Sequence, residues 1–125
     1  MNRISACGVL IALMMSLTGC SLFGGDKDKD EEREKTRLLS EQQLYERVQE
    51  LLDDESYDLA VKNLQLLESR FPFGVYAQQS QLEIIFAYYR NGDEDAAIAA
   101  ADRFLRLHPA HSDADYAWYM KGLAN

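Results

Sequence analysis

From Ser40 onward, apolar residues recur every three or four positions, which is the spacing of one face of an α-helix. The segment Ser40-Glu41-Gln42-Gln43 has the sequence of a capping box, in which the serine oxygen accepts an orphan amide and Gln43 reaches back. A helix is therefore predicted to begin just after Ser40. Its apolar stripe would consist of Leu44, Val48, Leu51 and Leu52.

A second helix is predicted from about Ser56 to Phe71, and a third from about Val75 to Arg90. The second must end before Pro72, because proline lacks the backbone amide and restricts the residue before it. The third ends at Asn91-Gly92, where a residue in the left-handed conformation is expected to cap it. The apolar faces would consist of Leu59, Ala60, Leu64 and Leu67 in the second helix, and of Leu82, Ile85, Phe86 and Tyr89 in the third.

A fourth helix is predicted to start after the capping residue Asp93 and to end at His108-Pro109. A fifth starts near Ser112 and runs to the end of the chain. No segment alternates with the period of a strand, and the connections are short. The sequence therefore predicts an all-α fold of about five helices. The face of the fourth helix would consist of Ala96, Ala97, Ala100, Ala101, Phe104 and Leu105.

The chain also repeats itself, since residues 54–72 align without gaps on residues 91–109 at an offset of 37. Ala60 falls on Ala97, and each of these alanines lies 12 positions before a proline. A small residue early in the second helix of a pair, with a proline closing that helix, is the pattern of the tetratricopeptide repeat (TPR). The small side chain lets the two helices approach closely. The pattern favours a TPR-like α-solenoid of antiparallel helix pairs; a generic antiparallel bundle is the alternative.

The helical domain is predicted to cover residues 38–125, with repeats at about 40–72 and 75–109 and a partial repeat at 112–125. The last repeat is incomplete, because it has a first helix and no second. A solenoid needs a terminal cap with a polar outer face, and the last helix is too apolar for that role. We expect this sequence to be the N-terminal part of a longer protein, or its last helix to have another partner. The apolar residues are Tyr116, Trp118, Tyr119, Met120 and Leu123.

Residues 1–19 have the features of a cleaved signal: Arg3, an apolar run from Ile4 to Leu17, and small residues before a cysteine. The run is too short for a permanent span, which needs about 20 apolar residues. The segment Leu17-Thr18-Gly19-Cys20 resembles a bacterial lipobox, so Cys20 is predicted to be lipidated and to become the N-terminus. An ordinary secretory signal with a chance cysteine and an uncleaved anchor are the alternatives.

Cleavage would remove Cys7 and leave Cys20 alone, so no disulfide framework is expected. Residues 20–37 are predicted to form the lipidated N-terminus and a flexible charged tether, because they are polar and almost free of apolar residues after Phe23. Ser21 follows the cysteine, and by analogy with lipoprotein sorting it permits transfer to the outer membrane.

The net charge and the chemistry-bearing side chains argue against several classes of function. The net charge of −8 argues against binding to nucleic acid or electrostatic docking on anionic lipid. No catalytic constellation is visible, so we expect no enzyme activity and no cofactor besides the lipid on Cys20. His108 and His111, with the nearby aspartates, could suggest a metal site. Pro109 separates them, however, and an ordinary loop between repeats is the interpretation adopted here.

The stretch Arg-Phe-Pro-Phe-Gly-Val-Tyr-Ala-Gln-Gln at residues 70–79 resembles the BamD family of outer-membrane lipoproteins. The similarity continues in Ala-Tyr-Tyr-Arg-Asn at 87–91, in Asp-Arg-Phe-Leu-Arg-Leu-His-Pro at 102–109 and in Tyr-Met-Lys-Gly-Leu at 119–123. It extends from the lipobox to Asn125, and the charged tether is the least similar part. Members of this family are longer than this chain and consist of several TPR units.

The resemblance implies a non-catalytic role in the complex that folds β-barrel proteins and inserts them into the outer membrane. The implied partners are BamA, accessory Bam lipoproteins and the C-terminal signals of unfolded barrel substrates. The implied location is the periplasmic face of the outer membrane, through the lipid anchor. The alternative is a lipid-anchored TPR adaptor for another envelope process such as cell division, with the same fold and anchor but other partners.

TPR arrays bind peptides along a concave face formed mainly by the first helix of each pair. Tyr76, Gln79, Glu83 and Arg90 are predicted to project from one such helix, although packing is an equally good role for Tyr76 and Arg90. An aromatic residue with a free carboxylate, as at the end of a barrel protein, needs an apolar slot and a cation. Phe73 and Tyr76 could form the slot. Arg90 or Arg103 could supply the cation by bidentate pairing.

Overall fold

The computed structural model describes residues 34–125. Residues 34–38 are helical, and Leu39–Asn125 form a compact unit of their own. The predicted signal at 1–19, the predicted lipidation site Cys20 and most of the predicted tether lie outside the described residues. The fold described below is that of Leu39–Asn125.

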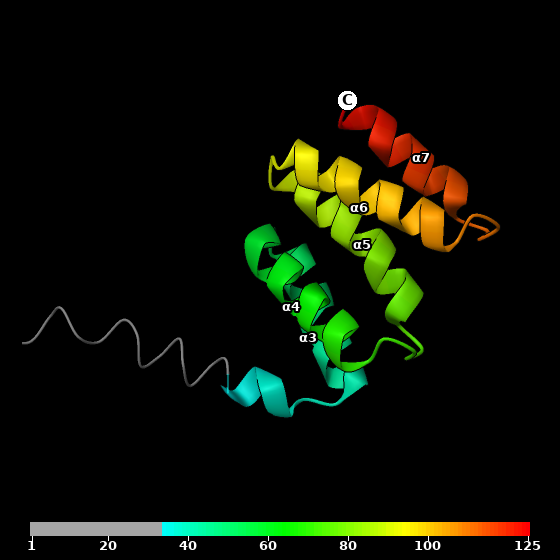
Figure 1. Cartoon of the computed structure of the whole chain (residues 1–125). Helices are drawn as coiled ribbons and strands as arrows, with labels where there is room; N and C mark the ends of the chain where they lie inside the picture. The colour runs from blue at the N-terminus through cyan, green and yellow to red at the C-terminus, as the bar shows by residue number, and fades with distance from the viewer. Residues whose placement is uncertain (1–33) are drawn as a thin grey trace, which may run out of the picture. The chain divides into compact units, whose positions relative to one another are not determined.

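This unit consists of five helices and, in the described part of the chain, no strand (Figure 1). The prediction of an all-α fold is confirmed. The third helix begins two residues later than expected, because Val75 belongs to an exposed turn, and the fifth also begins two residues late. The helices are α3 Glu41–Asp53, α4 Tyr57–Arg70, α5 Ala77–Arg90, α6 Glu94–Leu107 and α7 Ala114–Leu123.

The helix ends follow the capping chemistry of the sequence. Ser40 Oγ accepts a hydrogen bond from the Gln43 amide at 3.3 Å, and Gln43 Oε1 accepts one from the Ser40 amide at 3.0 Å. This is the predicted capping box. Asp93 accepts from the Ala96 amide at 3.4 Å and caps α6. Gly92 has a φ of +78°, the left-handed conformation that a residue without Cβ adopts at low cost.

The 37-residue repeat is reproduced in three dimensions. Helices α4 and α6 begin at Tyr57 and Glu94 and end at Arg70 and Leu107, a difference of 37 positions at both ends. Ala60 and Ala97, the two small residues of the predicted register, are both 0% exposed. The repeat pattern therefore identified correctly the residues at which each second helix is buried.

Each helix packs against the next, and α5 also contacts α7. Two core clusters hold this arrangement together, and α5 contributes to both of them. Because α5 contributes to both clusters, it joins α3 and α4 to α6 and α7. Full burial of one large apolar side chain stabilises a fold by about 1.5–3 kcal/mol. The first cluster consists of Val48, Val61, Leu64, Ile84 and Ala87, and the second of Leu82, Ile85, Ala101, Phe104, Ala117 and Met120.

One residue departs from the predicted apolar faces, and the last helix leaves most of its apolar residues accessible. Leu59 was expected on the buried face of α4 and is 42% exposed, because Ala60, Val61 and Leu64 face the neighbouring helices instead. Helix α7 buries only Ala117 and Met120, and its larger side chains stay accessible. The exposed residues of α7 are Tyr116, Trp118, Tyr119 and Leu123.

Candidate peptide-binding cleft

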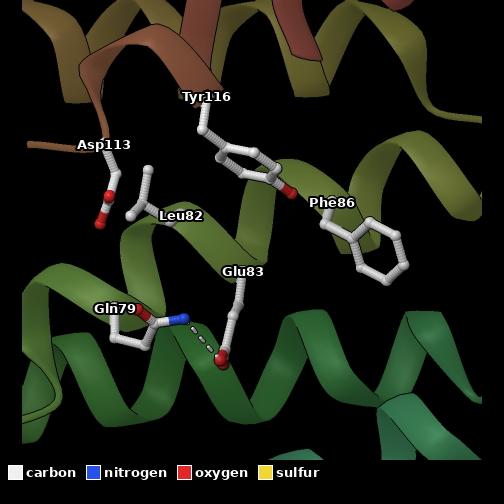
Figure 2. Close-up of a pocket in the computed structure, with 6 residues that line it drawn as sticks. All are labelled: Gln79, Leu82, Glu83, Phe86, Asp113 and Tyr116. Atoms are coloured by element: carbon white, nitrogen blue, oxygen red, sulfur yellow. Dashed lines mark hydrogen bonds between the residues drawn. The ribbon is translucent and has the colours of Figure 1, made fainter. Parts of the chain in front are cut away.

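A cleft of about 360 Å³ lies between α5 and α7. Helix α5 provides four lining residues at the spacing of one helical face, and the start of α7 provides two (Figure 2). These two helices are the first members of successive helix pairs, so the cleft lies where TPR arrays present their concave face. The lining residues are Gln79, Leu82, Glu83, Phe86, Asp113 and Tyr116.

Glu83 is the best anchored polar residue of the cleft. Its Oε1 accepts hydrogen bonds from Tyr45 Oη at 2.7 Å and from Gln79 Nε2 at 3.0 Å. Its Oε2 accepts one from Gln49 Nε2 at 3.0 Å. All three donors are neutral, and Glu83 forms no ion pair within residues 34–125. The carboxylate is therefore held in position by neutral groups, and no basic side chain of the described residues is paired with it.

The charge of this carboxylate acts on two tyrosines, Tyr45 and Tyr116. Burial, the hydrogen bond to Glu83 and the charge of Glu83 together raise the pKa of Tyr45 above its ordinary value. The pKa of Tyr116 is also raised, first by burial and then by the charge of Glu83. The negative charge of Glu83 therefore acts across the cleft on the side chain that α7 contributes.

The apolar part of the lining is packed against the core on one side and accessible on the other. Leu82 is 4% exposed and belongs to the core. The ring of Phe86 lies edge-on to the ring of Tyr57, with 6.1 Å between centroids. Tyr116 is 37% exposed. A ligand would meet fixed residues on α5 and an accessible aromatic ring on α7.

Of the residues predicted from the sequence, Gln79 and Glu83 line the cleft. Tyr76 lies at the N-cap of α5 and stacks on Tyr45 with 4.1 Å between ring centroids, so it supports the residue that donates to Glu83. Phe73 is 99% exposed in the turn before α5 and is not part of the lining.

The two predicted cations lie in ion pairs. Arg90 ends α5 and approaches Glu55 at 3.4 Å, with its guanidinium 5.6 Å from the centroid of Phe86. Arg90 is thus beside a lining residue without being one. Arg103 belongs to α6 and binds Glu68 of α4 through two hydrogen bonds, at 3.0 and 2.6 Å. The structure does not bring Arg103 to the cleft.

The histidine-rich turn before α7 interacts with α5. His108 Nε2 lies 2.9 Å from Gln81 Oε1, and His111 Nε2 lies 3.1 Å from Gln78 Oε1. No group of three or more potential metal ligands occurs within residues 34–125. The turn packs α7 against the preceding pair and so positions Asp113 at the cleft.

Four lining residues were not predicted as ligand contacts. Leu82 and Phe86 were expected in the core only, and Asp113 and Tyr116 were not expected to contact a ligand. The repeat contained a signal for one of them. Tyr116 lies 37 positions after Gln79, so the two residues occupy equivalent places in α7 and α5. Extending the alignment to the last helix would have placed Tyr116 beside the predicted groove.

The stacked helix pairs, and the cleft between their first helices, define a TPR-like helical-repeat protein. Residues 38–125 match the YfiO family, described as outer membrane lipoprotein, and the chain belongs to this family. It is similar to proteins named "Outer membrane protein assembly factor BamD". The relative from Neisseria meningitidis serogroup B is 42% identical over 113 residues, which is 90% of this chain and 41% of the relative.

A relative of the same name from Vibrio cholerae is 42% identical over 83 residues, which is 66% of this chain and 34% of the relative. The relative from Pasteurella multocida is 31% identical over 125 residues, which is all of this chain and 44% of the relative. The chain therefore spans less than half the length of these relatives. No helix within residues 34–125 is both long and apolar enough to cross a bilayer.

Proposed function

We propose that this chain is part of a non-catalytic TPR scaffold of the β-barrel assembly machinery in the outer membrane. Cys20 would carry the lipid that holds it at the periplasmic face. Its partners would be BamA, the accessory Bam lipoproteins and unfolded barrel proteins. The family description and the printed names of the relatives support this role over that of an adaptor for another envelope process.

The observation that carries the proposal is the cleft between α5 and α7. It combines accessible aromatic surface with fixed polar groups, the combination that gives a peptide site both affinity and orientation. An extended segment of an unfolded barrel strand alternates apolar and polar side chains. In this proposal its apolar residues contact Phe86 and Tyr116, and its polar residues contact Gln79 and Glu83.

Three residues outside the lining are proposed as contacts at the ends of the cleft. Tyr76 and Phe73 would provide apolar surface near the start of α5. Arg90 would meet a terminal carboxylate near its end, because the 3.4 Å pair with Glu55 is exposed and weak enough to exchange partners. Arg103 is the weaker candidate for this role, since Glu68 already holds it in two hydrogen bonds.

A fluorescence anisotropy titration of the full chain in detergent tests the proposal. The probe is a labelled peptide of about 10 residues, the length of one barrel strand, taken from the last strand of an outer-membrane protein. A scrambled peptide and a C-terminally amidated peptide are the controls. Saturable binding that depends on the order of residues is expected, and amidation should weaken it if a cation receives the carboxylate.

A matched pair of variants locates the site. Tyr116→Ala should weaken binding about tenfold, as expected for an aromatic contact at a binding hot spot. Trp118→Ala removes an exposed aromatic ring of the same helix that does not line the cleft, and it should leave the affinity unchanged. Equal effects of the two variants, or no binding of any peptide by a helical protein, would contradict the proposal.

A further inference from the structure

The charge of the cleft differs from what a site for a terminal carboxylate requires. Its lining contains two carboxylates, Glu83 and Asp113, and no basic side chain. The partners of Glu83 in the described residues are all neutral. Asp113 faces His111 at 3.8 Å, and this contact supplies positive charge only when the histidine is protonated. A ligand anion placed here would be repelled.

The same lining suits a long basic side chain. Leu82, Phe86 and Tyr116 offer an apolar surface for an aliphatic stem. Asp113 lies at the start of α7, and the carboxylate of Glu83 is turned toward Gln79 (Figure 2). Lysine and arginine bury their stems against apolar surface while their heads stay polar. A guanidinium or ammonium group is also attracted to the faces of aromatic rings.

Glu83 has an acceptor position that such a head group could use. Three hydrogen bonds hold its two oxygens, whereas an ionised carboxylate has about four acceptor positions. One position therefore remains for an incoming donor. Because neighbouring side chains already fix the carboxylate, a ligand cation would not have to order it, which lowers the entropic cost of binding.

Building on the proposed function, we propose that this cleft recognises an arginine or lysine side chain of an extended substrate segment. The open acceptor position of Glu83 receives the cation, Asp113 adds negative charge to the cleft, and the stem lies against Leu82, Phe86 and Tyr116. Arg90 lies seven residues after Glu83 on α5, a rise of about 10 Å, which corresponds to about three residues of extended peptide. The basic residue is therefore expected about three positions before a terminal carboxylate that reaches Arg90.

The test uses the full chain in detergent and three labelled peptides that differ at one position, about three residues before the C-terminus. They carry arginine, glutamine or glutamate there and are otherwise identical barrel-strand sequences. The arginine peptide should bind about tenfold more tightly than the glutamine peptide, in the range measured for close charged contacts. The glutamate peptide should bind most weakly. Added salt should reduce the difference by screening the charges.

Two variants assign the effect to the cleft. Asp113→Asn removes one carboxylate that makes no side-chain cap for α7, so the helix should remain intact. It should lower the preference for arginine over glutamine several-fold without weakening the glutamine peptide. Asp115→Asn removes an acidic residue of the same helix that does not line the cleft, and the preference should stay unchanged. Glu83→Gln should lower the preference further, with circular dichroism as the check on folding.

The outcomes separate this inference from the proposed function. If all three peptides bind equally well, or if Asp113→Asn and Asp115→Asn act alike, the cation site is wrong while peptide binding by the scaffold stands. If no peptide binds to a helical protein, the proposed function fails and the cation site fails with it. A preference for the glutamate peptide would reverse the assigned charge of the ligand.

Discussion

The ring of Tyr45 on α3 stacks on the ring of Tyr76 at the start of α5, with 4.1 Å between centroids and 12° between planes. The hydroxyl of Tyr45 continues from this stack to Glu83, at 2.7 Å. Tyr76 is held in turn by its amide, which donates to Glu41 Oε1 at 3.1 Å. Side chains of α3 and α5 thus fix the carboxylate of the cleft.

Removing one hydroxyl tests this arrangement. Tyr45→Phe keeps the stacked ring and removes the donor to Glu83, so the free energy of unfolding should fall by about 1.5–3 kcal/mol, the usual effect of a hydrogen bond to a charged group. Chemical denaturation followed by circular dichroism measures it. Tyr119→Phe is the matched control, because Tyr119 is 62% exposed, and it should change stability little. Equal stability of Tyr45→Phe and the unchanged protein would show that the hydrogen bond contributes nothing.

The same hydroxyl predicts a pH dependence. The pKa of Tyr45 is raised in the folded protein, first by burial and then by Glu83. When the pH exceeds about 10, the ordinary pKa of tyrosine, the unfolded chain loses the Tyr45 proton while the folded protein keeps it. This contribution to stability is complete below about pH 10 and declines as the pH rises further.

Denaturation midpoints measured between about pH 9 and pH 11 should reveal this loss of stability. Other groups also titrate there, so the informative quantity is the difference between the unchanged protein and Tyr45→Phe. The unchanged protein should lose more stability over this interval, and the gap between the two proteins should narrow. A gap that widens with pH would mean that the pKa of Tyr45 is lowered in the folded state.

The repeat register predicts a large effect at one alanine of α6 and a small effect at another. Ala97 is 0% exposed between α6 and its neighbours, whereas Ala99 is exposed on the same helix. Ala97→Glu should cost about 3 kcal/mol or more, because it places an unpaired charge in the core. Ala99→Glu should change the thermal midpoint only slightly. Similar midpoints for the two variants would contradict the assignment of Ala97 to the interface within the helix pair.

The lipobox prediction is tested with the two cysteines of the chain. Cys20→Ala should release the protein from membranes, because it removes the only predicted attachment point for lipid. Cys7→Ala lies in the predicted signal and should leave the anchoring unchanged. Fractionation of expressing cells, followed by detergent extraction of the membranes, distinguishes them. Membrane association of Cys20→Ala equal to that of Cys7→Ala would rule out the anchor at Cys20.

The sequence alone determined the helices and their pairing. Capping at Ser40, the stop before Pro72 and the left-handed Gly92 act within a few residues, so the sequence shows them directly. The small residues Ala60 and Ala97 were also recognisable, because the repeat places them at the same point of each pair. These features depend on local backbone chemistry and on periodicity.

The tertiary structure alone decided the charge of the cleft, because it places Asp113 in the lining and keeps Arg90 and Arg103 out of it. Asp113 and Tyr116 meet Gln79 and Glu83 only because α7 contacts α5 directly, although α6 lies between the two helices in the sequence. Tertiary packing also decided the ion pairs of the two arginines. Arg90 pairs with Glu55 and Arg103 with Glu68, and each pair is separated by 35 residues in the sequence. Contacts between distant residues depend on how whole helices pack, and the spacing of residues along one helix does not contain that information.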